Sequence, residues 1–358
     1  MNAKKSLAAL LFGFSSLAFA QEESKPLIQA DALKNVDINL LLRSAYEVPE
    51  NGVSGFKMNE ARLEFRGKVV KDLEFRVRTR LHKADPVNDF DGAAGHLDIA
   101  YAAYKFGEQK NWEITFGKQN NMMGSWEFDK NPTFEYQYSK AVGGYNNLFA
   151  MGARLSYSPV KDQTFTIQGQ NIQNKNFSVA GLEASKMPML VQAAWQGNFF
   201  DKKFRTWYSV GTSEYAKDKR NFHLALGNKV VLGNFEAYLD LAMANFAYNH
   251  TSLTSLVSED LNVKSAVLRM DYKFLPQWNV TAKGFYETFS ATKDKVKGDN
   301  FQSNTGYLLG LEYQPIKTQN MKFFTYYYGN NVNFKKGLGT NTNSNMFSIG
   351  VLYLVNVL

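Results

Sequence analysis

Cysteine is absent from this chain of 358 residues, and histidine and proline are scarce, with 4 and 8 residues. The lack of cysteine excludes a disulfide framework, thiolate metal sites and a cysteine nucleophile. The four histidines lie without the spacing of metal ligands, at His82, His96, His223 and His250. Zinc enzymes and catalytic triads are therefore poorly supported, and no metal or cofactor is expected.

Long apolar runs are missing after residue 20. The first twenty residues, MNAKKSLAALLFGFSSLAFA, combine a lysine pair with an apolar run and the small-x-small site Ala18-Phe19-Ala20. This pattern is typical of a secretory signal peptide, and its apolar run is shorter than the roughly 20 residues of a membrane-spanning helix. Residues 1–20 are therefore predicted to be a signal peptide, and residues 21–358 one mature domain.

A mature chain of this kind can cross a membrane only as a closed β-barrel. Aromatic residues make up 15% of the chain, and the mean hydropathy is −0.36. Alternation along strands hides the apolar half of a barrel, so this low value does not exclude one. The net charge of +8 is modest, and nucleic acid is not an expected partner of an exported chain.

Strand-like segments follow one another from about residue 36 to the end, with hardly any helical periodicity between them. The chain is therefore predicted to be all-β, with about sixteen strands whose ends are uncertain by about 2 to 4 residues. The predicted strands are 36–46, 56–69, 73–83, 97–106, 111–119, 148–158, 162–173, 188–199, 203–213, 220–232, 234–246, 262–274, 277–289, 303–314, 321–330 and 345–358.

The connections between these segments alternate between short and long along the chain. Short turns on one side and long loops on the other predict a transmembrane antiparallel up-and-down barrel of the outer-membrane type. A β-sandwich, the alternative, gives no reason for this separation. The long connections are 84–96, 120–147, 174–187, 247–261, 290–302 and 331–344.

Alternation within the segments predicts which face each side chain occupies. Residues 235–243 place phenylalanine, alanine, leucine and methionine on one face, which suits lipid. Residues 164–170 place threonine and glutamine on one face, which suits a water-filled lumen. Aromatic residues gather near strand ends, where the interfacial girdles of a barrel belong, although a sandwich core would also collect them.

Residues 73–83, LEFRVRTRLHK, carry three arginines on one face, and residues 61–69, ARLEFRGKV, alternate in the same way. A turn at 70–72 would join the two as a hairpin and create four rungs. The facing pairs are Lys68 with Glu74, Glu64 with Arg78, Arg66 with Arg76, and Arg62 with Arg80.

Two of these rungs oppose arginine to arginine, which destabilises a hairpin unless an anion intervenes. Guanidinium groups bind phosphate or carboxylate oxygens bidentately, and inward side chains recur about every 6.8 Å, so an anion can pass between rungs. An ion network that merely stiffens the wall is the open alternative. The predicted anion-binding residues are Arg62, Arg66, Arg76, Arg78 and Arg80.

Strong selectivity needs a constriction, because free charges in a wide lumen are screened over about 8 Å. The longest predicted loop, 120–147, is the candidate for folding into the lumen. It carries Lys130 and Lys140 together with several aromatic residues.

Three stretches are similar to a known family: ARLEFRGKVVKDLEFRVRTRL at 61–81, LDIAYAAYKF at 97–106 and ITFGKQ at 114–119. They resemble the phosphate-selective porins O and P of bacterial outer membranes. The resemblance implies a sixteen-stranded porin, a homotrimer, whose basic lumen passes phosphate or related anions. The chain departs from the family with NNMMG at 120–124, where Pro-Phe-Gly is usual, and with a final Leu358 in place of an aromatic residue.

The expected function is passive, anion-preferring diffusion of small solutes, with phosphate as the candidate, across an outer membrane whose lipid surrounds the barrel. The alternatives are a porin for other small polar solutes, a structural or secretion barrel, and an outer-membrane enzyme. Enzymatic activity is not expected, because His223, inward by alternation, has no identifiable inward serine or acid beside it.

Overall fold

The computed structural model describes most of the chain after residue 34. The described residues are 35–82, 87–88, 93–94, 96–130, 134–140, 149–172, 181–249, 253–291, 298–316 and 319–356. The predicted signal peptide, residues 1–20, and the terminal Leu358 lie outside them.

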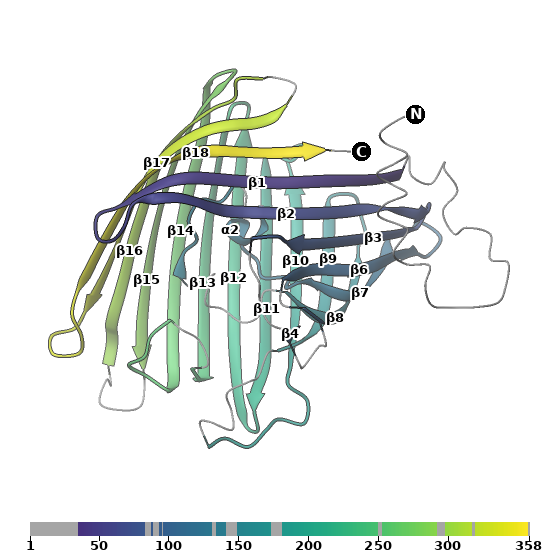
Figure 1. Cartoon of the computed structure of the whole chain (residues 1–358). Coiled ribbons are helices and arrows are strands. Elements are labelled where there is room, and N and C mark those ends of the chain that lie inside the picture. Colours follow the sequence, from purple (N-terminus) through teal and green to yellow (C-terminus); the bar gives the residue numbers. More distant parts are fainter. Residues whose placement is uncertain are drawn as a thin grey trace.

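The described residues form a closed antiparallel barrel of sixteen strands (Figure 1). Each strand pairs with its neighbour in the chain, and β1 also pairs with β18, which closes the barrel. All sixteen predicted strands are present. The barrel strands are β1 (Val36–Pro49), β2 (Gly55–Val70), β3 (Leu73–Arg80), β6 (Leu97–Phe106), β7 (Trp112–Asn120), β8 (Phe149–Tyr157), β9 (Gln163–Asn171), β10 (Met189–Phe199), β11 (Phe204–Ala216), β12 (Lys219–Leu232), β13 (Phe235–Tyr248), β14 (Glu259–Leu275), β15 (Trp278–Ala291), β16 (Gly298–Tyr313), β17 (Asn320–Phe334) and β18 (Thr342–Asn356).

The two faces of the strands differ as alternation predicts. On β13, Leu239, Leu241 and Met243 are exposed on the outside, whereas Tyr238 and Asp240 are buried inside. This division gives the barrel an apolar outer surface and a polar inner surface.

The connections confirm the predicted separation of short and long links, with two exceptions. On the side of the long loops, residues 217–218 form a two-residue turn between β11 and β12, and residues 50–54 are a short link between β1 and β2. The predicted loop 84–96 contains the small hairpin of β4 (Val87–Asn88) and β5 (Ala93–Ala94).

Aromatic side chains pair beside the short turns. The rings of Trp112 and Tyr157 stack with centroids 4.3 Å apart, and those of Trp278 and Tyr313 lie 4.6 Å apart. Such rings at strand ends form the girdle that anchors a barrel at the membrane boundary.

The connection after β7 contains the short helix α2 (Trp126–Asp129). Among the described residues, no helix has both the length and the apolar character needed to cross a membrane.

Candidate permeation site in the barrel lumen

The segment that follows β7 turns into the barrel lumen. The described part of residues 121–140 is called the inserted loop here. At its start the backbone N–H of Gly124 donates to Ser209 Oγ of β11 (2.8 Å). Further on, the Tyr136 hydroxyl donates to Glu312 Oε1 of β16 (2.7 Å). Four strands lie between β11 and β16 in the barrel order. The inserted loop therefore runs along a broad arc of the inner wall, with α2 inside the barrel (Figure 1).

Glycine at position 124 permits close contact between the inserted loop and the wall. A Cβ on Gly124 would lie 2.5 Å from the Trp207 carbonyl oxygen, which no side chain tolerates without a shift of backbone. Two residues before Gly124, the backbone N–H of Met122 donates to Gln168 Oε1 (2.9 Å). The loop therefore begins by hydrogen bonding directly to side chains of the wall.

Asp240 of β13 receives the N-terminus of α2. Its carboxylate accepts from Ser125 Oγ (2.8 Å), the Trp126 N–H (3.0 Å) and the Glu127 N–H (2.8 Å). The first N–H groups of a helix have no intrahelical acceptor, and the helix dipole favours negative charge there. Asp240 thus fixes the position of α2 against the wall.

A buried ion network holds the middle of the inserted loop. Lys283 of β15 binds the carboxylates of Glu127 and Glu135, the latter at 2.8 Å. Glu135 also lies 2.9 Å from Arg269 of β14, which in turn lies 2.9 Å from Asp271. Glu127 and Glu135 are completely buried. Burial raises the pKa of the Glu135 carboxyl, but Arg269 and Lys283 outweigh burial and hold that pKa below its ordinary value.

The two predicted loop lysines have different surroundings. Lys130 Nζ lies 2.9 Å from Asp271 Oδ2, and burial lowers the pKa of this lysine. Its charge is therefore balanced within the protein rather than offered to a solute. Lys140 is exposed.

Aromatic packing fixes the far end of the inserted loop. The Tyr136 ring lies 4.7 Å from the Phe324 ring and 5.1 Å from the Tyr326 ring, both on β17. Arg43 of β1 lies over the Tyr136 ring, 5.5 Å from its centroid, and donates to the Glu135 carbonyl oxygen (2.8 Å). The loop thus reaches the strand that neighbours the arginine-bearing hairpin.

The hairpin of β2 and β3 has the predicted register. Its facing pairs are Arg62 with Arg80, Glu64 with Arg78, Arg66 with Arg76, and Lys68 with Glu74. A register shift after Lys68 leaves these four rungs intact. All five predicted arginines therefore lie on the same face of the hairpin, at successive heights along the lumen.

One carboxylate, Asp98 of β6, lies among three of these arginines. Arg62 binds it through Nη1, Arg80 Nε lies 3.0 Å from it, and Arg78 Nε lies 3.4 Å from it. Glu60 supplies a second carboxylate to Arg62 (2.8 Å). The Asp98 side chain is only 2% exposed, so three guanidinium groups converge on one buried acid.

The remaining rungs also have carboxylate partners inside the protein, which is the arrangement that the alternative of an ion network in the wall predicts. Glu64 accepts from Arg76 Nε (3.1 Å) and Nη2 (2.8 Å), not from Arg78 as the facing register suggested. Arg66, whose side chain is 55% exposed, lies 3.0 Å from Asp37 of β1. Long side chains reach diagonally across rungs and to the next strand, so the facing residue does not decide the partner.

A β-bulge explains why Asp98 reaches the lumen. The pairing of β3 with β6 sets Arg78 opposite Ile99 and Thr79 opposite Leu97, which leaves Asp98 as the extra residue. Such an extra residue re-aims a side chain that strict alternation would place on the other face. Sequence reasoning missed Asp98, because a bulge of this kind leaves no signal in the alternation of residues.

The sequence also missed the residues that hold the inserted loop. Their partners are more than 100 residues away in the chain, and no local pattern signals such pairings. The only available signal was the presence of charged residues at inward positions of central strands. These residues are Asp240, Arg269, Asp271, Lys283 and Glu312.

The inner wall of β9 and β10 is neutral and polar. The predicted lumen series Thr166, Gln168 and Gln170 is buried on the inner side. Gln170 Nε2 donates to the Gln119 carbonyl oxygen (2.8 Å), and Ser156 and Thr166 share a hydrogen bond of 3.1 Å. The lumen therefore has an arginine-bearing side on β2 and β3 and an uncharged amide and hydroxyl side on β9 and β10.

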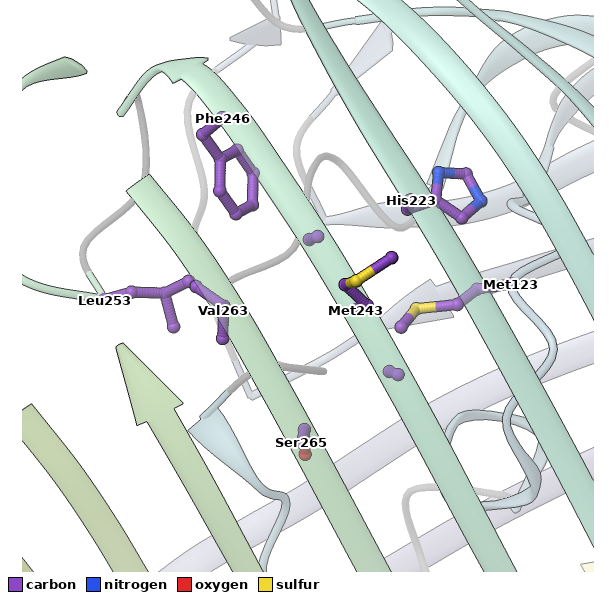
Figure 2. Close-up of a pocket in the computed structure, with 9 residues that line it drawn as sticks. Met123, His223, Met243, Phe246, Leu253, Val263 and Ser265 are labelled. Carbon is purple, nitrogen blue, oxygen red and sulfur yellow. The ribbon is translucent and has the colours of Figure 1, made fainter. Parts of the chain in front are cut away.

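A small cavity of about 10 Å³ lies beside the start of the inserted loop. Figure 2 shows Met123 and His223 on one side of it and Phe246, Leu253 and Val263 on the other. Its size is close to that of a single water molecule, so it is a packing defect rather than a solute site. Within the described residues, no three histidine or carboxylate side chains form a group that could hold a metal ion.

A closed barrel with an apolar exterior, a polar lumen and a loop folded inside defines an outer-membrane porin. A family model for phosphate-selective porins O and P matches residues 44–353, and the chain belongs to this family. This membership confirms the resemblance found in the sequence and places the protein in the bacterial outer membrane.

Solved structures share the fold at low identity. The outer-membrane channel DcaP of Acinetobacter baumannii is 13% identical with a TM-score of 0.64, covering 90% of this chain and 96% of that one. OmpF of Salmonella typhi, in a complex with daunomycin, is 18% identical with a TM-score of 0.63, covering 92% and 99%. OmpT of Vibrio cholerae is 13% identical with a TM-score of 0.61, covering 92% and 99%. No match is found among curated proteins.

Proposed function

We propose that this porin gives small anions, phosphate among them, passive diffusion across the outer membrane along the arginines of β2 and β3. One observation carries the proposal: three guanidinium groups, those of Arg62, Arg78 and Arg80, share the carboxylate of Asp98. Even with Glu60 on Arg62, this cluster has more cations than anions. The family's name adds support for phosphate as a solute.

The arginines that are partly exposed to water are one member of this cluster and two of its neighbours. The side chains of Arg66, Arg76 and Arg80 are 55%, 31% and 20% exposed. Successive inward positions are separated by about 6.8 Å, so a small anion can pass from one guanidinium to the next. The inserted loop narrows the lumen, which brings the solute closer to these charges than the screening length of about 8 Å.

The test is the reversal potential in planar bilayers with a potassium chloride or potassium phosphate gradient. The informative variant is Arg66→Gln with Arg80→Gln. Arg80 can be removed without isolating Asp98, because Arg62 and Arg78 remain beside it. Arg76 is unsuitable, because it holds the buried carboxylate of Glu64.

Anion preference is expected in the native protein and a clear decrease in the double variant. The matched control is Lys110→Gln with Lys217→Gln, which removes two exposed cations from the turns and leaves the lumen intact. A native pore without anion preference, or a double variant that keeps the native preference, would contradict the proposal.

A porin for other small polar solutes is the second candidate. It is favoured by the carboxylate beside every predicted arginine, which makes the hairpin a largely balanced ion network. In that case the reversal potentials of the native protein and the double variant stay close to zero. Under either proposal the pore carries out no enzymatic reaction, and residues 1–20 are removed during export.

We also propose that the chain assembles as a homotrimer. One structural relative, OmpT of Vibrio cholerae, is described in a trimer form. Mass measurement of the detergent-solubilised protein by light scattering tests this assembly, and a monomeric mass would contradict it.

A further inference from the structure

The outer surface of β12 to β16 is hollowed. Two adjoining hollows have volumes of about 480 Å³ and about 430 Å³. Both are lined by Ala266 and Tyr286, so they form one continuous groove on the outside of the barrel. This groove lies away from the lumen and has no part in the proposed solute path.

A glycine leaves the floor of the groove open. Gly284 faces outward opposite Tyr307, and a Cβ there would meet nothing closer than the Gly306 carbonyl oxygen at 3.9 Å. The Tyr307 ring leans the other way, over Gly329, where a Cβ would lie 2.4 Å from the ring. The large side chain opposite Gly284 on β16 therefore covers a different glycine.

The walls of the groove are apolar. Leu239, Leu268 and Met270 line it, with 40%, 44% and 40% of their surface exposed. In an outer-membrane barrel this surface faces lipid, and an unfilled hollow would forfeit dispersion contacts along its lining. A hydrocarbon chain is the occupant that restores them.

A lysine lies at one end of the groove. Lys264 lines the second hollow, is exposed, and is opposite Met243 on β13 and Thr288 on β15. The ion pairs found among the described residues include no partner for it. Lysine on the outer face of a barrel is unfavourable unless it reaches the headgroup level, where it attracts anionic groups.

The height of Lys264 places it at a particular leaflet. It lies in the part of β14 nearer the 249–258 loop, on the side of the long loops. The neighbouring Tyr286 is 51% exposed, as expected of an aromatic residue at the membrane boundary. In the expected orientation the long loops face the outside, where the outer leaflet consists of phosphorylated glycolipid.

We propose that this groove is a binding site for lipid A, with one acyl chain in the hollow at Gly284 and a phosphate on Lys264. The apolar floor and walls match the chain, and the single ammonium group matches the phosphate. The proposal does not depend on which solutes pass through the lumen.

The experiment is native mass spectrometry of the refolded porin, titrated with bis-phosphorylated lipid A. The native protein is expected to retain the lipid, and Lys264→Gln to weaken retention about fivefold, as expected for the loss of one charge at a lipid surface. Gly284→Leu places a side chain in the hollow, where an added Cβ meets no atom closer than 3.9 Å, and should also weaken retention. Phosphatidylethanolamine and dephosphorylated lipid A should be retained less than lipid A by the native protein.

Two matched variants serve as controls. Ala153→Leu places a leucine on the exposed outer face of β8, away from the groove, and Lys217→Gln removes an exposed cation from a turn on the same side of the barrel. Both should retain lipid A like the native protein. Equal retention by native protein and Lys264→Gln, or equal retention of dephosphorylated lipid A, would overturn the proposal. Lys264→Gln alters no packing, so it decides the question even if Gly284→Leu fails to assemble.

Discussion

Glu135 of the inserted loop lies 2.9 Å from Arg269 of β14, and the two side chains are 0% and 2% exposed. Removing one member of a buried ion pair leaves an uncompensated charge and costs about 3 to 5 kcal/mol. This pair therefore contributes to holding the loop inside the lumen, together with Lys283, which also binds Glu135.

Replacement of Glu135 by Gln should release the middle of the inserted loop, because Arg269 and Lys283 then lose a shared carboxylate. The expected result is a larger single-channel conductance and a lower thermal unfolding temperature. Lys217→Gln, which breaks an exposed pair with Glu183, is the control and should change neither quantity. Unchanged conductance in Glu135→Gln would show that the loop stays in place without this carboxylate.

The ion pairs of Glu135 should resist mild acid. The pKa of Glu135 is held below its ordinary value in the folded protein, so the stabilisation that these pairs give is complete above the usual carboxyl pKa of about 4.3. It is lost only as the pH falls through the lower folded value. The difference in conductance between the native protein and Glu135→Gln should therefore stay constant from neutral pH to about pH 5 and decrease only in stronger acid. A decrease of this difference that begins near pH 6 would contradict this interpretation of the ion pairs.

Replacement of Asp98 by Asn should increase anion preference and decrease stability, because Arg62, Arg78 and Arg80 then lack their shared charge. Reversal potentials measure the first effect, and the temperature at which the barrel unfolds in detergent measures the second. Glu60→Gln is the matched control, since Glu60 contacts only one of the three arginines. A fall in anion preference in Asp98→Asn would contradict the proposed role of this wall.

Trypsin added to intact cells should cut the loop between β17 and β18 and spare Lys130 of the inserted loop. Lys335 and Lys336 are exposed, whereas Lys130 is paired with Asp271 inside the lumen. Mass spectrometry of the released peptides locates the cut. Cleavage confined to Lys110 and Lys202, in the short turns, would reverse the orientation of the barrel.

The strands were predictable because each barrel strand repeats one simple rule, an alternation of lipid-facing and lumen-facing side chains. The same rule gave the register of β2 and β3, since a slip by one residue would move Arg76 and Arg78 into lipid at about 2 to 4 kcal/mol each. The carboxylate partners of those arginines could not be predicted from alternation. Asp98 entered the lumen through a bulge, and Glu64 reached Arg76 diagonally, which depends on side-chain geometry rather than on position in the sequence.

The sequence predicted a loop that folds into the lumen, but it did not predict which residues of the wall this loop contacts. Its length made it the candidate for folding into the lumen. Glu127 and Lys283, which form an ion pair, are separated by 156 positions in the sequence. A contact between residues so far apart produces no periodic pattern in the sequence. Lys130 was predicted as part of a constriction, and its pairing with Asp271 could not be predicted.

The pairing of β1 with β18 bears on how the protein is made. Leu40 lies opposite Val355, so the seam that completes the cylinder joins the earliest and latest parts of the mature chain. Until β18 pairs with β1, the sheet is open, and its two edge strands present unpaired N–H and C=O groups. Exposed strand edges of this kind promote aggregation. Biogenesis therefore requires that the translocated polypeptide be shielded by a carrier until its last strand is available, and truncation at the C-terminus should be far more harmful than its small loss of mass suggests.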